Sequence, residues 1–441
     1  MIHRVLLAGR RVPWPRTALV MPALVLVALA GCGADLEDLA SRVLEPITGT
    51  EIGRPSLRIA TCWGRSDRQE IERELDDRAE GTRSFRLIWI ELPEGTPLSR
   101  LGAHLPPFDV FLGGPLADYE RLARAGRLQP LEDDAQAYWQ VARRSLIDRA
   151  SPLGQGDERP ALDDPRVSPL TLAWAAGVLE SGAWQDGYAA LVRDFGHSLH
   201  RPGWLAGGAL ASRLREPGWS LVASRAPGTP RDVPPDSRSI VYEEGAAIVR
   251  GARHEAAARR FLQYLASRSR IGGRSSGRSI DPDATDLLAD LLGATLVDAQ
   301  DELRATWKIL DRSDSSVKAQ ALLWLNEPPP WPPASVEKLQ NQGGDRAIAL
   351  VHELAGQVAP DPALRFWLIQ NWLKPRRLLD RALFSELSRA EDGRLVREPR
   401  FRAWLRGEWT AWARQRYRRV ARLLVSGVAR AAGGPPRSPS R

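Results

Sequence analysis

Residues 57–63 read Leu-Arg-Ile-Ala-Thr-Cys-Trp, and residues 66–81, which follow almost directly, read SDRQEIERELDDRAEG. The first segment is short and rich in apolar and β-branched residues, as expected of a strand. The second opens on Ser66 with Gln69 three residues later, a capping box that marks the start of a helix. The folded part of the chain is therefore expected to begin at residue 57 with a strand followed by a helix.

The same alternation of strands and helices continues to about residue 270. Residues 85–90 and 108–112 are apolar segments that predict strands, and residues 116–126 predict a helix. Further strands are predicted at 219–223, 240–242 and 246–249, and further helices at 168–179, 184–194 and 255–266. Strands separated by helices indicate βαβ units, so we expect an α/β fold with mainly parallel sheets over residues 57–270.

Beyond a segment rich in Arg, Ser and Gly at residues 267–279, the pattern becomes helical almost throughout. Residues 283–425 carry apolar side chains at helical spacing, and no strand is evident there. Residues 271–441 are therefore expected to form an all-α C-terminal region with a basic tail. The tract Pro-Pro-Pro-Trp-Pro-Pro at residues 328–333 is interpreted as a rigid internal connection between helices, with a docking ligand for another protein as the alternative.

The tail forms an amphipathic basic helix over residues 401–428. Its apolar side consists of Phe401, Trp404, Leu405, Trp409, Trp412, Val420 and Leu424. Two interpretations remain open. The helix packs its tryptophans on the rest of the protein, as amphipathic helices of globular proteins do, or it lies on an anionic membrane or partner.

The first residues of the chain have the features of an export signal. Residues 1–17 contain arginines and no acid, and an apolar run at residues 17–30 follows. The run ends in Leu29-Ala30-Gly31-Cys32, which resembles the bacterial lipobox and implies a signal peptide at residues 1–31 and lipidation of Cys32. A tether follows at residues 32–56. The alternative is an uncleaved N-terminal helix, although fourteen residues span a bilayer poorly.

The charge of the chain is concentrated at its ends. The formal net charge is +8, but residues 400–441 alone contribute +10, and residues 32–399 carry a net charge of −6. A basic composition confined to a tail and a signal does not describe a nucleic-acid-binding body, so no nucleic-acid partner is expected.

Enzyme motifs are incomplete in this sequence. His254 and His352 each precede a glutamate, but Ala258 and Gly356 stand where a zinc protease needs its second histidine. Residues 273–277 match the Gly-x-Ser-x-Gly spacing of esterases, but they lie in an arginine-rich loop and not on a strand-to-helix turn. We therefore expect no enzymatic activity and no cofactor.

Three segments of the chain resemble the type 2 solute-binding proteins of bacterial ABC importers, especially the group that includes ferric-ion binders. They are residues 241–265, residues 108–128, and the glycine-rich loop at 207–210 with the segment at 219–223. The resemblance implies two α/β lobes that enclose a small molecule or ion and deliver it to an ABC permease, in a monomer tied to the membrane by the lipid on Cys32. The adjacent tyrosines that hold iron in the ferric group are absent, since residues 219–222 read Trp-Ser-Leu-Val, so no metal is expected.

In this architecture the ligand lies at the carboxyl ends of strands and at helix N-termini. The resemblance and this geometry together predict as ligand-binding residues Trp63, Gly64, Arg65, Ser66, Gly113, Gly114, Gly207, Gly208 and Tyr242. Each has a plain structural alternative: ordinary helix capping for residues 63–66, simple turns for the two glycine pairs, and half-buried packing for Tyr242. Glu243 and Glu244 are expected to be solvated.

The sequence as a whole therefore predicts a lipid-anchored solute-binding protein of the cell envelope. The competing hypothesis is an envelope lipoprotein that kept the fold, has no transport role, and acts through protein contacts of its helical region. A polar, accessible cleft would favour the first, and a filled cleft with an exposed apolar surface on residues 283–425 would favour the second.

Overall fold

The computed structural model describes residues 55–78, 85–92, 98, 108–131, 137–148, 162–180, 183–197, 239–268, 281–374, 377–379, 381–389 and 393–432. The predicted signal peptide, Cys32 and nearly all of the tether lie outside these residues. So do Gly207, Gly208, the strand predicted at 219–223 and the expected boundary between residues 270 and 271.

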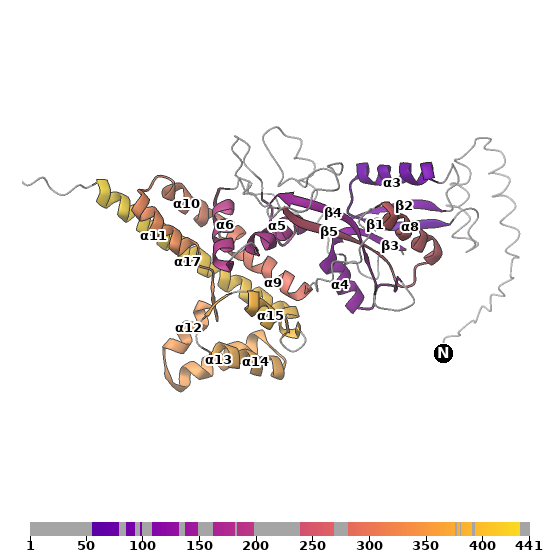
Figure 1. The fold of residues 1–441 in the computed structure, drawn as a ribbon. Helices are drawn as coiled ribbons and strands as arrows, with labels where there is room; N and C mark the ends of the chain where they lie inside the picture. Colours follow the sequence, from indigo (N-terminus) through magenta and orange to yellow (C-terminus); the bar gives the residue numbers. More distant parts are fainter. Residues whose placement is uncertain are drawn as a thin grey trace, which may run out of the picture. The chain divides into compact units, whose positions relative to one another are not determined.

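Among the described residues, five strands form one sheet in the order β2-β1-β3-β5-β4 (Figure 1). Their bounds are β1 Ser56–Thr61, β2 Arg86–Glu91, β3 Val110–Pro115, β4 Gln140–Asp148 and β5 Ser239–Ile248. β1 and β3 run parallel, with Ile59 opposite Val110, and β5 runs antiparallel to both β3 and β4. The prediction of an α/β region followed by an all-α region is confirmed. A second lobe with its own sheet would fall largely on residues that are not described.

The apolar segments chosen from the sequence form the centre of this sheet. Residues 110–114 of β3 are all buried, which is typical of an inner strand covered on both faces. Helix α4, Leu116–Arg124, follows β3 directly and packs Tyr119 and Leu122 against Phe111. Helices α3, Arg65–Arg78, and α8, Glu255–Arg268, are the other helices of this region, and Phe261 of α8 contacts Trp89 edge to face, with 6.5 Å between ring centroids.

Two details of the predicted sheet are wrong. The segments predicted as separate strands at 240–242 and 246–249 are one strand, β5, which continues through Glu243, Glu244 and Gly245. Strand β4 was not predicted at all, because Arg143 and Arg144 interrupt its apolar pattern. The cause is the same in both cases: the polar residues pair across β4 and β5 in the ladder, and backbone pairing decides the structure over composition.

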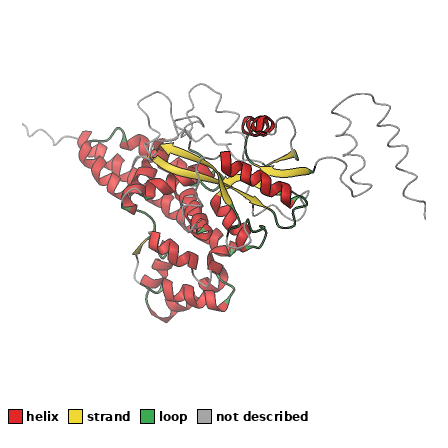
Figure 2. Cartoon of the chain, turned by 45° about the vertical axis from the view of Figure 1, so that its right-hand side comes forward, coloured by secondary structure: helices red, strands yellow, loops and turns green. Residues whose placement is uncertain are grey.

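The C-terminal region is helical over nearly its whole length, as predicted (Figure 2). Its helices are α9 Pro282–Leu292, the π-helical turn η3 Gly293–Val297, α10 Gln300–Leu310, α11 Ser315–Leu325, α12 Ala334–Asn341, α13 Gly344–Val358, α14 Pro362–Trp372, α15 Arg381–Arg389, α16 Arg394–Arg397 and α17 Pro399–Ala432. The expectation of no strand is wrong in one small respect, since β6, Pro330–Trp331, pairs with β7, Arg377–Leu378. No helix in the described part of the chain has the length and apolar content to cross a membrane.

Helices from both sides of the expected boundary share one core. Helices α5, Pro169–Leu179, and α6, Trp184–His197, bury Trp174 and Tyr188 in the same cluster as Trp307 of α10 and Tyr417 of α17. The Tyr417 hydroxyl donates to the Thr295 carbonyl at 3.0 Å, which satisfies its polar atom inside this core. The two helices that follow β4 in the chain are therefore built into the C-terminal helical region.

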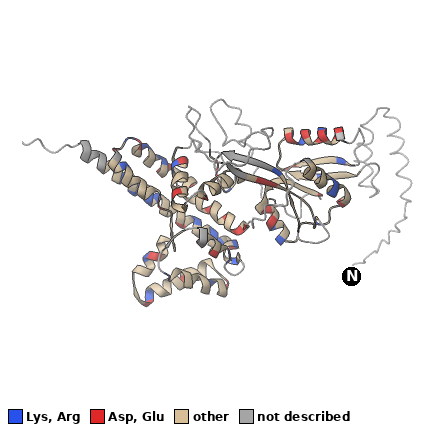
Figure 3. Ribbon diagram, viewed as in Figure 1, with Lys and Arg blue, Asp and Glu red and all other residues tan. Residues whose placement is uncertain are grey.

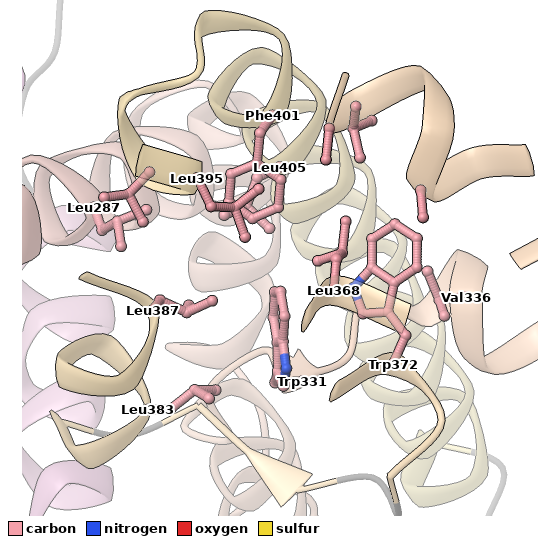
Figure 4. Close-up of a cluster of buried hydrophobic side chains, with 14 of the residues drawn as sticks. Leu287, Trp331, Val336, Leu368, Trp372, Leu383, Leu387, Leu395, Phe401 and Leu405 are labelled. Atoms are coloured by element: carbon pink, nitrogen blue, oxygen red, sulfur yellow. The ribbon is translucent and has the colours of Figure 1, made fainter. Parts of the chain in front are cut away.

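A second core lies around Trp331 (Figure 4). Trp331, in the proline tract, is 1% exposed and is surrounded by leucines of α9, α14, α15 and α17. The tract is therefore the internal connection that the sequence predicted. On the apolar side of α17, Phe401, Leu405 and Trp409 are buried in this core, and Val420 and Leu424 are buried in the first one, so this helix packs on the protein.

A chain of charged side chains joins α4 to α9 and α17. Arg121 of α4 forms ion pairs with Asp118 and with Asp286 of α9. Asp286 also pairs with Arg402 of α17 at 3.1 Å, and Arg402 reaches Asp290 at 2.7 Å. Figure 3 shows acidic residues on α9 and basic residues on α17. Because Asp118 and Asp290 are nearly fully buried, these ions depend on their partners to offset desolvation.

Helix α14 provides a matched test of the second core. Leu368 is fully buried in it, whereas Phe366, two residues away, is 67% exposed. We expect Leu368→Ala to lower the free energy of unfolding by about 2 to 5 kcal/mol, because it leaves a cavity. Phe366→Ala should change it by less than about 0.5 kcal/mol. Urea denaturation of both variants measures the difference, and equal effects would show that the core is not packed as described.

Candidate functional site

The order of the strands contains a switch point, where the chain changes from one side of a strand to the other. The chain passes from β1 to β2 on one side of β1, and then to β3 on the other side. Open α/β sheets bind ligands at such a switch point, next to the carboxyl ends of the two strands that flank it. Here these ends are Thr61 with the residues after it, and Gly113 with Gly114. Two groups of predicted site residues are thus brought together.

Trp63 fills the space beside Gly113. It is 5% exposed, and its backbone N–H donates to Thr61 Oγ1 at 3.0 Å. Gly113 has φ of +85°, and a Cβ built on it would lie 2.6 Å from Trp63 Cδ1 and Nε1. Glycine is therefore needed at 113 both for its backbone conformation and because the Trp63 ring approaches the backbone there. The close approach predicted for a ligand at Gly113 is made by Trp63 instead.

Glu244 turns inward next to these residues. Its side chain is 12% exposed, and its Oε1 accepts from the Gly114 N–H at 3.4 Å. The expectation that Glu244 is solvated is wrong, because the residue lies in the middle of β5 between β3 and β4. Trp63 Nε1 is buried and has no partner in hydrogen-bonding geometry within the described residues, although it lies close enough to Glu244 to lower the pKa of that carboxyl.

Arg143 of β4 completes the group. Its Nη1 donates to Asp67 Oδ2 at 3.2 Å, and its Nε lies 3.7 Å from Glu244 Oε2. The guanidinium carbon is 5.4 Å from the centroid of the Trp63 ring, within the range of a cation–π interaction. A register shift in β4 between Val141 and Arg143 places Arg143 opposite Glu244. We refer to Trp63, Asp67, Arg143 and Glu244 as the Arg143 cluster.

Burial dominates the electrostatics of the Arg143 cluster. It raises the pKa of Glu244 above its usual value, while Arg143, the Gly114 amide and Trp63 lower it by smaller amounts and Asp67 raises it. Glu244 is therefore a carboxylate whose charge is poorly solvated by its surroundings. Ionisable groups with shifted pKa values are more frequent at functional sites than elsewhere, although structural ion pairs also shift pKa values.

Tyr119 of α4 connects the two strands that carry Gly113 and Glu244. Its hydroxyl oxygen lies 2.6 Å from the Gly113 carbonyl oxygen and 2.8 Å from that of Gly245, so it bridges β3 and β5. Burial raises its pKa well above the usual value, and the nearby Cys62 and Glu244 add to this. Tyr119 thus acts as a neutral donor that fixes the two strands around Glu244.

The other predicted site residues lie at the margin of this cluster or outside the description. Arg65 and Ser66 are exposed at the start of α3, and Gly64 accepts from the Arg68 N–H at 3.2 Å as part of ordinary helix initiation. Tyr242 is half-buried and packs against the core that contains α5 and α6, which is the packing alternative. Gly207 and Gly208 are not described. In the described part of the chain, no group of three or more His, Cys, Asp or Glu side chains is arranged to hold a metal.

Sequence reasoning missed Asp67, Tyr119, Arg143 and Glu244. Asp67 and Tyr119 carry no distinguishing signal, because acids in a first helical turn and tyrosines in amphipathic helices are common. Glu244 carried only a weak signal, because Glu243 and Glu244 together interrupt a largely apolar segment directly before Gly245. The position of Arg143 beside Glu244 can be recognised only when the pairing of β4 with β5 is known.

No protein-family model matches this sequence, and no curated protein matches it. Its structure is similar over about half its length to solved periplasmic binding proteins. Iron-bound HitA from Pseudomonas aeruginosa has 13% identity and a TM-score of 0.33, covering 51% of this chain and 90% of that one. The sulfate-binding protein SubI from Mycobacterium tuberculosis has 17% identity and a TM-score of 0.33, covering 54% and 86%. These values are too low to assign a ligand or an activity.

The contact between Gly113 and Trp63 can be tested by adding one methyl group. We expect Gly113→Ala to destabilise the protein by at least about 1 to 2 kcal/mol, the cost of placing a side chain in the left-handed region, with the contact against Trp63 adding to it. Gly64→Ala is the matched control, since Gly64 has nothing within 4 Å of a built Cβ and should change stability little. Thermal and urea unfolding of both variants decide the matter, and a neutral Gly113→Ala would disprove the contact.

Proposed function

We propose that this chain is an exported solute-binding protein that captures a small solute at the Arg143 cluster and delivers it to an ABC-type membrane permease. The observation that carries the proposal is the convergence of buried polar groups at the switch point of the sheet. Glu244 and the Trp63 indole N–H are not needed to pair strands, and burying them beside the half-buried Arg143 costs stability. Retaining such groups at the position where α/β sheets bind ligands supports a binding role.

Export and anchoring are supported by the sequence alone. The arginine-rich start, the apolar run and Leu29-Ala30-Gly31-Cys32 support cleavage before Cys32 and lipidation of its thiol. A lipid on Cys32 would hold the binding region at the membrane surface, where a permease is within reach of the tether.

The anchoring proposal is tested with Cys32→Ser in the full-length precursor expressed in a bacterial host. The unchanged protein should fractionate with membranes and take up radiolabelled palmitate. The Cys32→Ser variant should lose the label, because a hydroxyl cannot form the thioether. Cys62→Ser is the matched control and should keep both label and location. Equal labelling of the unchanged protein and Cys32→Ser would place the lipid elsewhere or show that there is none.

A second candidate function is favoured by a separate observation. The C-terminal helices expose several large apolar side chains, and Leu323, Ile348, Phe366 and Leu373 are between 45% and 74% exposed. Ile348 and Leu373 also line a groove with Lys374 and Glu337. Exposed apolar residues beside charged ones are typical of protein contact surfaces. An envelope lipoprotein that acts through protein contacts of its helical region is therefore the alternative.

The solute-binding proposal is tested by thermal unfolding of the mature protein against a panel, with Cys32 replaced by Ser so that residues 32–441 are produced without a lipid. The panel contains agmatine, putrescine, choline, phosphate, sulfate, glucose, maltose and zinc chloride. A true ligand at a hundred times its dissociation constant should raise the free energy of unfolding by about 2.7 kcal/mol. Hits are then confirmed by calorimetric titration.

The matched control for the panel is Glu244→Gln, which keeps the shape of the side chain and removes its charge. A hit at the Arg143 cluster should weaken or disappear in this variant, whereas a ligand bound elsewhere should not change. Flat unfolding curves with every compound would overturn the solute-binding proposal and favour the protein-contact alternative.

A further inference from the structure

The Arg143 cluster already contains a cation at its centre. The Arg143 guanidinium lies over the Trp63 ring and between the carboxylates of Asp67 and Glu244. An aromatic face with two carboxylates is the arrangement that recognises guanidinium and ammonium groups, because the ring quadrupole and both charges attract the same cation. Without Arg143, these three side chains carry a net charge of −2.

Arg143 is a partly exposed member of this arrangement and is attached to its most peripheral strand. Its side chain is 28% exposed, close to the 27% of Asp67 and above the 12% of Glu244. Among the described residues, β4 pairs only with β5, at the end of the sheet order. A flexible arginine side chain on such a strand can rotate toward solvent without breaking the ladder.

We infer that the solute is an organic cation with a guanidinium or ammonium group, which displaces the Arg143 side chain and takes its place between Trp63, Asp67 and Glu244. This inference rests on the proposed solute-binding function and names the class of solute for that site. Arg143 then acts as an internal competitor that holds the site in shape while it is empty.

The surroundings favour a cation over an anion in this position. The Gly114 N–H, which would receive an anion at the end of β3, already donates to Glu244. The printed contacts of the Glu244 carboxylate are long: the Gly114 N–H lies 3.4 Å from Oε1, and Arg143 Nε lies 3.7 Å from Oε2. When Arg143 moves away, a bound cation replaces the positive charge that Asp67 and Glu244 lose, whereas an anion would meet two carboxylates. Burial raises the pKa of Glu244 despite these contacts, which agrees with a carboxylate whose charge they only partly offset.

The experiment measures agmatine and putrescine binding by calorimetric titration to the mature protein and three variants. Glu244→Gln and Asp67→Asn remove the two charges with little change of shape, and each should weaken binding about tenfold or more, as expected for a lost charged hydrogen bond. Arg143→Ala removes the internal competitor and should tighten binding by about tenfold, since the site no longer has to be vacated. Arg124→Ala, at an exposed position of α4, is the matched control and should bind as the unchanged protein does.

Each outcome either supports the inference or overturns it. Binding of agmatine or putrescine that weakens in Glu244→Gln and Asp67→Asn and tightens in Arg143→Ala supports it. Binding that is unchanged in the two amide variants places the cation elsewhere and overturns it. If the Arg143→Ala variant binds a cation and the unchanged protein does not, Arg143 occupies the site permanently, and this result also overturns the inference. If phosphate, sulfate or a sugar binds and no cation does, the inferred class of solute is wrong but the proposed solute-binding function stands. If no compound of the panel binds, the proposed function itself is overturned.

Discussion

The position of the Glu244 carboxylate depends on one structural constraint, the pairing of β5 with strands on both of its edges. Glu244 is opposite Pro115 of β3 and opposite Arg143 of β4 in the register of the sheet. Both neighbouring strands have a register shift near this point, between Leu112 and Pro115 and between Val141 and Arg143. Such irregularities redirect side chains locally. They bring the Gly114 amide and the Arg143 guanidinium to the same carboxylate.

This constraint extends into the helical region through α4. Tyr119 on one side of α4 bridges Gly113 and Gly245, and Arg121, two residues later, pairs with Asp286 of α9. Asp286 and Asp290 in turn hold Arg402 of α17. Removing one member of such a chain leaves a buried charge without its partner, which costs more than the pair itself contributes. The C-terminal helices are therefore part of the structure that keeps the site in place.

The sequence predicted the parts of the fold whose apolar pattern is continuous. The strands around Ile59 and Val110 and the helix that holds Tyr119 were placed within a few residues, and Trp63 was assigned to the site together with Gly113 and Gly114. Strand β4 and the burial of Glu244 were missed for a common reason. Arg143 and Glu244 lie opposite each other across the sheet, and a pairing between residues about a hundred positions apart leaves no local pattern in the sequence.

The shared core of α5, α6, α10 and α17 limits how far α5 and α6 can move. Here, α5 and α6 follow β4 and are packed with Trp307 and Tyr417 into the C-terminal core. Moving them would break apolar contacts in a core where Trp174 and Tyr188 are fully buried, at a cost of several kcal/mol. Rotation of the Arg143 side chain leaves this core intact, and under the proposed function the positive charge of the solute replaces that of Arg143 beside Glu244, so a change at this side chain requires no movement of α5 and α6.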